Sequence, residues 1–215
     1  MTGPTPVELD EMKALGAATL FHGQGERGAV DPAIKPISFG MRLSGPALTV
    51  DVPPGDNLAM HLAIAKAAPG DVIVVDYKGH MDVAVTGDIM ALAAKTRGVA
   101  GFVVDGAVRD AEDIAEMDFP VFARGLSIKG PSKDAPGTVG EPIRLGGIDV
   151  QTGDYIVGDA DGIVVIAQDS WAETLENARA REAKEAGIRR QFAHGKTTVE
   201  LLGLEEPLKR HGMHL

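Results

Sequence analysis

Three charged residues, Asp88, Arg109 and Asp110, have types and a spacing that could support chemistry on a small anionic substrate. Twenty residues separate Asp88 from the Arg109-Asp110 pair. Hard divalent cations prefer carboxylate oxygens, and a guanidinium binds an anionic oxygen pair through its planar N–H donors. If the fold brings these side chains into one cleft, they could hold a divalent cation and an anionic substrate together.

The residues between these charges predict a helix at 88–96 followed by a buried strand at 101–104. A helix-plus-strand unit returns the chain to the end at which it began, so Asp88 can face the Arg109-Asp110 pair. Simpler roles exist for the same residues. The sole role of Asp88 could be to cap its helix, and Arg109 and Asp110 could form a surface ion pair that contributes little to stability.

The pattern elsewhere predicts one mixed α/β layered domain over residues 1–215. Residues 1–6 are expected to be flexible, residues 19–44 to form a loop, and residues 170–215 to form a helical extension that packs on a neighbouring subunit. A helix at 58–68 would be capped by Asp56 or Asn57. The remaining predicted elements are helices at 7–16 and 110–117, strands at 48–52, 72–75 and 121–123, and a hairpin formed by 155–157 and 163–166.

The composition excludes several functional classes. With 215 residues and 44% hydrophobic residues, the chain can bury a core as one domain. The absence of cysteine excludes disulfides, thiolate metal sites and a cysteine nucleophile, and it fits a reducing cytoplasm. A net charge of −10 argues against a nucleic-acid partner. No apolar run reaches the roughly 18 residues of a membrane span, and the first residues do not read as a signal peptide, so we expect a cytoplasmic protein without a membrane partner.

Three further patterns do not support a binding site. The Gly23–Gly28 segment matches GxGxxG, but Pro32 and Pro36 prevent the helix that a dinucleotide site requires. Asp159-Ala160-Asp161-Gly162 begins like a calcium loop, yet it lacks the later glutamate and reads as a turn. Zinc is disfavoured because five histidines show no pairing at zinc-site spacing, namely His61, His80, His194, His211 and His214.

Five segments occur in a fixed order along the chain: Pro54–His61, Pro69–Asp76, Asp88–Asp110 with its Asp-x20-Arg-Asp spacing, Pro120–Gly125 and Gly153–Val165. Together they resemble the 4-hydroxy-4-methyl-2-oxoglutarate / 4-carboxy-4-hydroxy-2-oxoadipate aldolases. These divalent-metal pyruvate aldolases share a fold with the regulator of ribonuclease E activity. The likeness runs from about Leu15 to Leu204, and it implies a swivelling β/β/α layered sandwich with a protruding C-terminal helix.

The resemblance implies a metal-dependent lyase. It would cleave 4-hydroxy-2-oxo di- or tricarboxylic acids to pyruvate and an oxo acid, and it would decarboxylate oxaloacetate through the same pyruvate enolate. Asp110 would be the direct ligand of Mg²⁺ or Mn²⁺, and Asp88 would contact the metal through water. Few protein ligands and several waters suit these cations, which dehydrate reluctantly.

The resemblance also implies the substrate contacts. Arg109 would hold the ketone oxygen, and the amides of Ile89 and Met90 would face the pyruvate carboxylate.

Three side chains from outside this unit are further candidates for substrate binding. Asn57 and His61 lie four residues apart on one helix face, and the resemblance places both in the pocket. On spacing alone, His61 is equally a structural histidine. Lys133 is either a substrate-carboxylate contact or a solvated loop charge.

The resemblance links the expected site to subunit assembly through the C-terminal helix. Glu182 and Glu185 would ordinarily be solvated, but the resemblance implies that a glutamate of this region enters a neighbouring subunit's site. Glu185 is the first candidate, and the expected assembly is a homotrimer or homohexamer.

One departure from the family pattern bears on the substrate. Family members generally read Tyr/His-Glu-Ala-x-Gly where this chain has Phe21-His22-Gly23-Gln24-Gly25. The resemblance associates that glutamate with proton transfer, and here His22 takes its place. A histidine can move protons near neutral pH. Two alternatives therefore remain: a lyase that acts mainly on oxaloacetate or another substrate, and a non-catalytic binding protein like the ribonuclease regulator.

Overall fold

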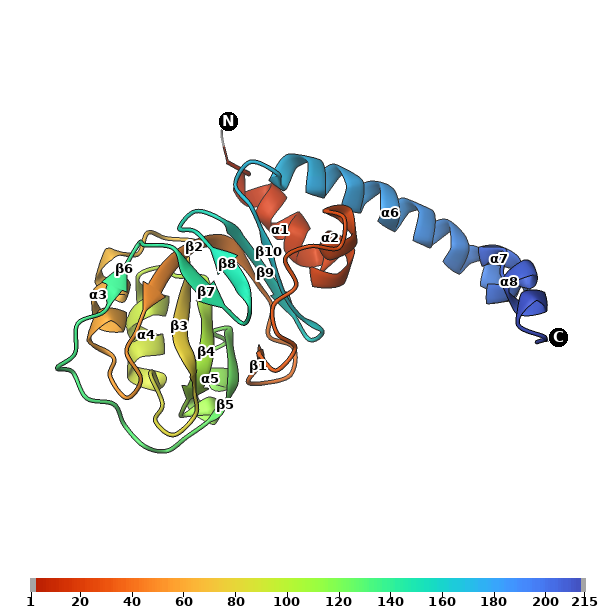
Figure 1. The fold of residues 1–215 in the computed structure, drawn as a ribbon. Helices are drawn as coiled ribbons and strands as arrows, with labels where there is room; N and C mark the ends of the chain where they lie inside the picture. Colours follow the sequence, from red (N-terminus) through yellow and green to blue (C-terminus); the bar gives the residue numbers. More distant parts are fainter. Residues whose placement is uncertain (1–2, 214–215) are drawn as a thin grey trace.

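An eight-stranded sheet forms the centre of the computed structural model, which describes residues 3–213 (Figure 1). Its strands follow the order β1-β5-β4-β3-β2-β9-β10, and β6 pairs with β2. The bounds are β1 Lys35–Pro36, β2 Leu43–Asp51, β3 Val72–His80, β4 Gly101–Val108, β5 Val121–Leu126, β6 Thr138–Val139, β9 Tyr155–Asp159 and β10 Gly162–Ile166. A separate hairpin consists of β7 (Ile143–Leu145) and β8 (Ile148–Val150).

Strand β2 belongs to both halves of the sheet. Residues 43–46 pair with β9 in antiparallel register, whereas residues 47–51 pair with β3 in parallel register. Strands β3, β4 and β5 continue the parallel part, and β1 and β10 stand at the two ends of the order. The side chain of Lys35 on β1 donates a hydrogen bond to the Asp161 carbonyl beside β10, so the sheet curls toward closure.

Helices cover the two parts of the sheet separately (Figure 1). Helices α3 (Leu58–Lys66), α4 (Asp88–Thr96) and α5 (Ala111–Glu116) connect the parallel strands. Helices α1 (Pro6–Leu15), α2 (Ala17–Gly23) and the first turns of α6 (Trp171–Phe192) pack on β9 and β10. The parallel strands therefore end at an edge that is free of the N- and C-terminal helices.

The central strands are buried on both faces over their apolar stretches, which are residues 72–75 in β3 and 101–104 in β4. In β3, Ile73 and Val75 pack toward α3, α4 and α5, while Val72 and Val74 pack toward the β7–β8 side. All residues of β4 are buried. This rigid pair of strands carries the loops in which the candidate site residues lie.

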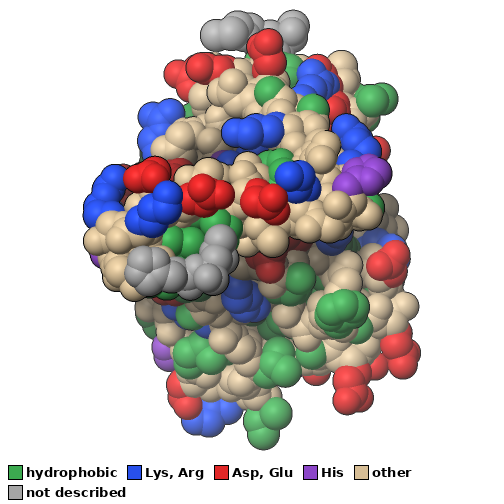
Figure 2. All heavy atoms as spheres, turned by 90° about the vertical axis from the view of Figure 1, so that its right-hand side faces the viewer, with side chains coloured by type: hydrophobic (Ala, Val, Ile, Leu, Met, Phe, Trp, Pro, Cys, Tyr) green, Lys and Arg blue, Asp and Glu red, His purple; other side chains and the backbone are tan. Residues whose placement is uncertain are grey.

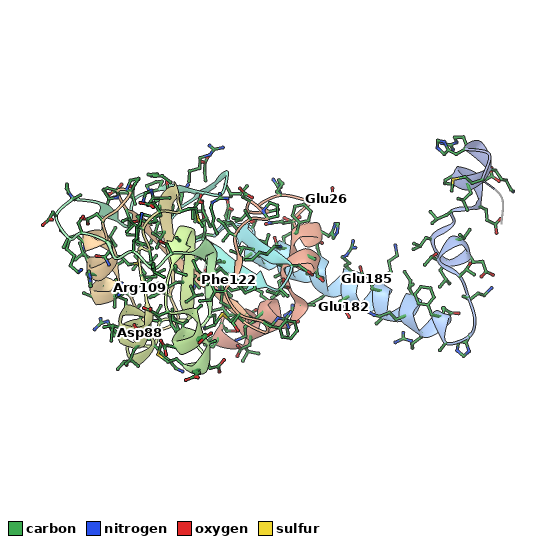
Figure 3. The ribbon with its side chains drawn as sticks, turned by 90° about the horizontal axis from the view of Figure 1, so that it is seen from below. Glu26, Asp88, Arg109, Phe122, Glu182 and Glu185 are labelled. Carbon is green, nitrogen blue, oxygen red and sulfur yellow. The ribbon has the colours of Figure 1, made fainter. Side chains whose placement is uncertain are left out.

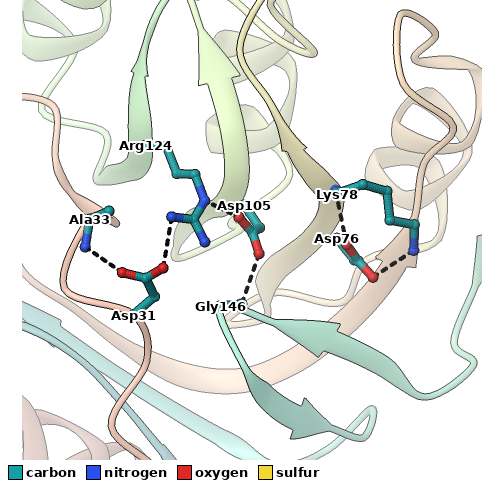
Figure 4. Close-up of polar contacts among 7 residues, drawn as sticks. All are labelled: Asp31, Ala33, Asp76, Lys78, Asp105, Arg124 and Gly146. Atoms are coloured by element: carbon teal, nitrogen blue, oxygen red, sulfur yellow. Dashed lines mark hydrogen bonds and ion pairs between the residues drawn. The ribbon is translucent and has the colours of Figure 1, made fainter.

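A partly buried ion-pair network joins the sheet to the hairpin and to the loop before β1 (Figure 4). Arg124 of β5 donates to Asp105 of β4 and, at 2.9 Å, to Asp31. The second oxygen of Asp105 accepts from the Gly146 amide at 2.8 Å. Hydrogen bonds from the Ala33 amide and from Arg124 lower the pKa of the Asp31 carboxyl. The network holds together four segments that are far apart in the sequence.

The C-terminal part of the chain forms an arm that leaves the body of the molecule (Figure 1). Helix α6 buries Thr174, Leu175 and Ala178, but no residue of the described range 179–213 is buried. Helices α7 (Thr198–Leu202) and α8 (Glu205–Arg210) lie at its far end. Figure 2, which looks at the molecule from the side of this arm, shows acidic and basic side chains interspersed with a few hydrophobic ones. Within residues 3–213, no helix combines the length and hydropathy that crossing a membrane requires.

The predicted α/β fold with a protruding C-terminal helix is confirmed, but the loop predicted at residues 19–44 is wrong. The segment expected to be a loop at 19–44 contains most of α2, all of β1 and the start of β2. The flexibility expected for residues 1–6 stays a prediction. Within this segment, the Thr5 side chain forms a capping box with Glu8, and Pro6 is the first residue of α1. Residues 1 and 2 of that segment, and residues 214 and 215 of the extension, lie outside the described residues.

Candidate active site

A cavity of about 190 Å³ lies where α3, α4 and the end of β4 meet. Seven predicted residues line it: Asn57, His61, Asp88, Ile89, Met90, Arg109 and Lys133. Two residues that the sequence analysis missed, Thr86 and Gly87, complete the lining. Their only signal in the sequence is a Thr-Gly pair directly before Asp88.

The backbone brings the two ends of the α4–β4 unit together. The amide of Arg109 donates to the Thr86 carbonyl at 3.0 Å, and the amide of Val85 donates to the Ala107 carbonyl at 3.0 Å. As a result, the first residue of α4 lies against the residues that follow β4. The expected convergence of Asp88 with Arg109 and Asp110 is thus a property of this fold.

Asp110 is the centre of this arrangement. Its Oδ2 accepts from the Arg109 Nε at 3.1 Å and from the Asp88 amide at 3.3 Å. Asp110 has left-handed backbone angles, φ 58° and ψ 41°, which is unusual for a residue other than glycine. Such geometry persists only where surrounding contacts hold it, and it is common at functional sites.

Gly87 is required by the close approach of the Asp110 side chain. A Cβ atom at position 87 would lie 2.2 Å from the Asp110 Oδ2 and 3.0 Å from the Arg109 Nε. Gly87 has extended backbone angles and is the N-cap of α4. The expectation that Asp88 might cap the helix is therefore wrong, because Asp88 is the first helical residue and its carboxylate is not used as a cap.

The start of α4 also presents backbone donors to the cavity. The first amides of a helix have no acceptor within the helix, and they favour a bound anion. Ile89 and Met90, which follow Asp88, both line the cavity. A carboxylate placed there would be held by backbone N–H groups next to the Arg109 guanidinium.

Asp56 holds the loop that carries Lys133. Burial opposes ionisation of Asp56, but hydrogen bonds from the Leu58 amide, the Ser132 hydroxyl and the amides of Ala135 and Asp134 outweigh it, so its pKa is well below the usual range. Asp56, rather than Asn57, therefore contacts the first amide of α3, since Asn57 makes no side-chain cap bond.

His61 and Lys133 form the wall of the cavity that faces the start of α4. Burial and the nearby Lys133 ammonium lower the pKa of His61, which favours the neutral imidazole near pH 7. Lys133 is exposed on its loop and lines the same cavity. This wall therefore offers one cationic side chain and one neutral imidazole to an acidic ligand.

A second cavity, of about 300 Å³, lies on the other side of the Arg109-Asp110 pair. Leu126, Ser127 and Ile128 form the rest of its lining, and both of its hydrophobic side chains are largely exposed. The sequence analysis did not single out these residues. Arg109 therefore lines both cavities, whereas Asp110 lines only the second one.

The donor set fits a hydrated divalent cation. Within the described residues, no group of three or more His, Cys, Asp or Glu side chains is arranged to hold a metal ion. Asp110 and Asp88 supply two carboxylates beside the cavity, and one oxygen of Asp110 already accepts two hydrogen bonds. Mg²⁺ and Mn²⁺ accept sites with one or two carboxylates and several waters, whereas a zinc centre normally needs three or four protein ligands.

Two predicted catalytic residues lie away from this cavity within the chain. His22 is on α2, where its Nδ1 lies 3.3 Å from Glu26, and Glu185 is on α6, where it pairs with Arg181 at 2.9 Å. Figure 3 shows Asp88 and Arg109 at one end of the molecule, with Glu26 beyond the sheet and Glu182 and Glu185 on the arm. The structure therefore does not bring His22 or Glu185 to Arg109 of the same chain.

The fold and this cavity define an α/β protein with a small cavity that is lined by Arg109 and Lys133 and lies next to two carboxylates. A sequence family described as "RraA-like: Aldolase/RraA" matches residues 9–165. The chain therefore belongs to the Aldolase/RraA family.

Similar proteins agree with this assignment. A Halalkalibacterium halodurans protein provisionally named 4-hydroxy-4-methyl-2-oxoglutarate aldolase is 44% identical over 160 residues, which cover 74% of this chain and 76% of the relative. An uncharacterized Pseudomonas syringae protein of known structure is 32% identical, with a TM-score of 0.81 over 94% of this chain and 99% of that one. The RNA-processing inhibitor RraA from Thermus thermophilis is 29% identical, with a TM-score of 0.60 over 64% of this chain and 84% of that one.

Proposed function

We propose that this protein is a divalent-metal-dependent lyase that cleaves 4-hydroxy-2-oxo acids to pyruvate and a second oxo acid. The observation that carries this proposal is that the α4 N-terminus and Arg109 line one cavity, while the Asp110 carboxylate accepts hydrogen bonds from both the Asp88 amide and the Arg109 side chain. The aldolase name of the Halalkalibacterium halodurans relative supports the reaction class.

The residues of the chain have distinct roles in this proposal. The amides at the start of α4 bind the carboxylate of the pyruvate half, and the Arg109 guanidinium holds the ketone oxygen as negative charge develops on it. Asp110 and Asp88 would hold Mg²⁺ or Mn²⁺, which supplies Lewis-acid stabilisation of that charge when bound. Asp88 would accept, through a water molecule, the proton of the C4 hydroxyl.

The opposite wall suits a substrate with a second carboxylate. Lys133 provides an ammonium group for it, His61 provides a neutral polar contact, and Asn57 lines the same wall. Oxaloacetate would bind in the same way, and its decarboxylation would proceed through the same pyruvate enolate. We therefore expect oxaloacetate decarboxylation as a second activity.

A panel of acids tests this function. Pyruvate should be released, in the presence of Mg²⁺, from 4-hydroxy-4-methyl-2-oxoglutarate or 4-carboxy-4-hydroxy-2-oxoadipate, and from oxaloacetate at a lower rate. A coupled lactate dehydrogenase assay measures this release. A higher kcat/KM for oxaloacetate would make decarboxylation the main reaction. No pyruvate from any of the three acids would favour a non-catalytic binding protein like the RNA-processing inhibitor.

Replacing Gly87 with alanine should damage catalysis much more than folding. The new Cβ would displace the Asp110 carboxylate, which lies 2.2 Å from its position. A misplacement of about 1 Å can lower a rate by about 10²-fold, and we expect a loss of that order in pyruvate release. The side chains of Arg109 and Asp110 are 42% and 31% exposed and can move into solvent, so the Tm should fall by only a few degrees. A wild-type rate in Gly87→Ala would show that Asp110 need not stay in this position.

His22 and Glu185 would complete the site only from another copy of the chain. The exposed α6 arm is the element that could make this contact, and we propose a homotrimer or homohexamer on this basis. Multi-angle light scattering should report a trimer or hexamer at assay concentrations. A fully active monomer would remove both residues from the catalytic site.

A further inference from the structure

Two residues that line the cavity each have a buried side-chain oxygen without a hydrogen-bond partner among residues 3–213. These oxygens are the Oδ1 of Asn57 and the Oγ1 of Thr86. Both residues are 3% exposed, and both line the cavity. A buried polar atom without a partner is destabilising, so such atoms call for an explanation, and a bound ligand can provide one.

The neighbours of Asn57 fix the orientation of its side-chain amide. Its Nδ2 donates to the Val85 carbonyl at 3.0 Å and contacts the Met90 Sδ at 3.3 Å. Both neighbours are acceptors, so an exchange of the amide oxygen and nitrogen would place two acceptors against each other. The Oδ1 of Asn57 is therefore an acceptor that lacks a donor.

Thr86 offers the complementary group. Its carbonyl accepts from the Arg109 amide, which fixes its backbone beside the catalytic arginine, but its hydroxyl is unused. A hydroxyl can donate and accept. Because neither oxygen is exposed to solvent, the Thr86 side chain has to rotate to another staggered χ1 position, and the Asn57 amide has to turn, before either oxygen can contact a ligand in the cavity.

A second buried threonine shows what a structural hydroxyl looks like in this fold. Thr49 is fully buried, and its Oγ1 contacts the Glu141 carbonyl at 2.7 Å and the Thr152 hydroxyl at 2.6 Å. Its hydroxyl stabilises the packing of β2. Thr86 has no such contacts, and so its hydroxyl is not explained by the stability of the fold.

We propose that Thr86 and Asn57 recognise the alcohol group of the substrate, with the Thr86 hydroxyl donating a hydrogen bond to the alcohol oxygen and the Asn57 Oδ1 accepting a hydrogen bond from the alcohol O–H. This inference rests on the proposed function and deepens it, because it makes the hydroxyl of a 4-hydroxy-2-oxo acid a specificity determinant. Sites built to bind a hydroxyl reject analogues without one, because their own polar groups are then left unpaired. The site would therefore favour hydroxylated oxo acids over oxo acids of the same skeleton.

The test compares 4-hydroxy-2-oxoglutarate with 2-oxoglutarate, two acids that differ only in the 4-hydroxyl group. Calorimetric titrations in EDTA, which stops metal-dependent turnover, should show the hydroxylated acid binding roughly 10- to 100-fold more tightly to the wild type. In Thr86→Val this ratio should fall to about 3 or less, while the affinity for 2-oxoglutarate stays within about 3-fold. Thr86→Ser should restore the preference.

A stability measurement separates recognition from a structural role. Thr86→Val removes a hydroxyl without a partner, so its Tm should equal or exceed that of the wild type. Thr49→Val, the matched control, should lower the Tm by about 2–8 °C, because it leaves the Glu141 carbonyl and the Thr152 hydroxyl without this contact. The control should keep the wild-type preference for the hydroxylated acid.

The outcomes for this inference and for the proposed function are distinct. Equal affinities for the two acids in the wild type, no binding of either acid, or a clear loss of Tm in Thr86→Val would each overturn the inference. Pyruvate release with Mg²⁺ is measured separately. A hydroxyl preference without pyruvate release would leave the inference standing and remove the lyase function.

Discussion

Chelation with EDTA should abolish pyruvate release from 4-hydroxy-2-oxo acids, and added Mg²⁺ or Mn²⁺ should restore it. The physical reason is that Arg109 supplies one positive group for the developing enolate, while Asp88 and Asp110 bring negative charge to the same place. Without a cation to balance the carboxylates, the site would disfavour the anion that the reaction forms. We expect residual activity of less than about 1%, since a Lewis acid contributes several kcal/mol to charge stabilisation.

The opposite result would identify a different mechanism. Full activity in EDTA, together with inactivation by borohydride and pyruvate, would indicate an imine formed by a lysine. Lys133, which lines the cavity from an exposed loop, would then be the candidate. As a control for structural effects of chelation, the melting temperature should be measured with and without EDTA, because the fold and its core are built without metal ligands among the described residues.

The variant Arg109→Lys should be nearly as inactive as Arg109→Ala. In the structure the Nε of Arg109 is occupied by Asp110, which orients the guanidinium plane and leaves its other N–H donors for an oxyanion. A lysine has one flexible ammonium group and cannot both hold Asp110 and present a fixed pair of donors. Loss of one oxyanion donor typically lowers kcat about 10²- to 10³-fold, and we expect at least this loss for both variants.

Arg144→Lys is the matched control for this substitution. Arg144 forms an exposed ion pair with Asp149 on the β7–β8 hairpin, and such pairs contribute little to stability. The control should show wild-type rates. If Arg109→Lys also turned over like the wild type, Arg109 would act only as a general positive charge, and the proposed contact with the ketone oxygen would be wrong.

The position of the central charges could be predicted from the sequence because it depends on local geometry. A helix followed by a buried strand must return near its starting point, so Asp88 and Arg109 had to approach one another. The apolar run at residues 101–104 also predicted a strand with both faces buried. These residues belong to β4, in which every residue is buried. These conclusions needed only periodicity and the length of the segment.

Features that depend on distant contacts could not be predicted in this way. Helix α2 reads as a loop because glycines surround it, yet Gly23 is needed because a Cβ there would lie 2.7 Å from the Thr174 carbonyl of α6. The importance of Gly87 similarly comes from the approach of Asp110 and not from its neighbours in the sequence. The unused hydroxyl of Thr86 is visible only once its surroundings are known.

The hydrogen bonds around Asp56 give the cavity a measure of acid tolerance. A carboxyl whose pKa is depressed in the folded state contributes stability above its unfolded pKa, near 3.9, and loses that contribution as the pH falls through the folded value. The folded pKa of Asp56 lies well below the usual range, so from neutral pH to about pH 4 its contribution is constant. Over that interval the loop 132–135 should stay attached to the start of α3, and Lys133 should remain beside the ligand. Acidification should therefore affect the ligand, His61 and the other carboxylates before it loosens this wall.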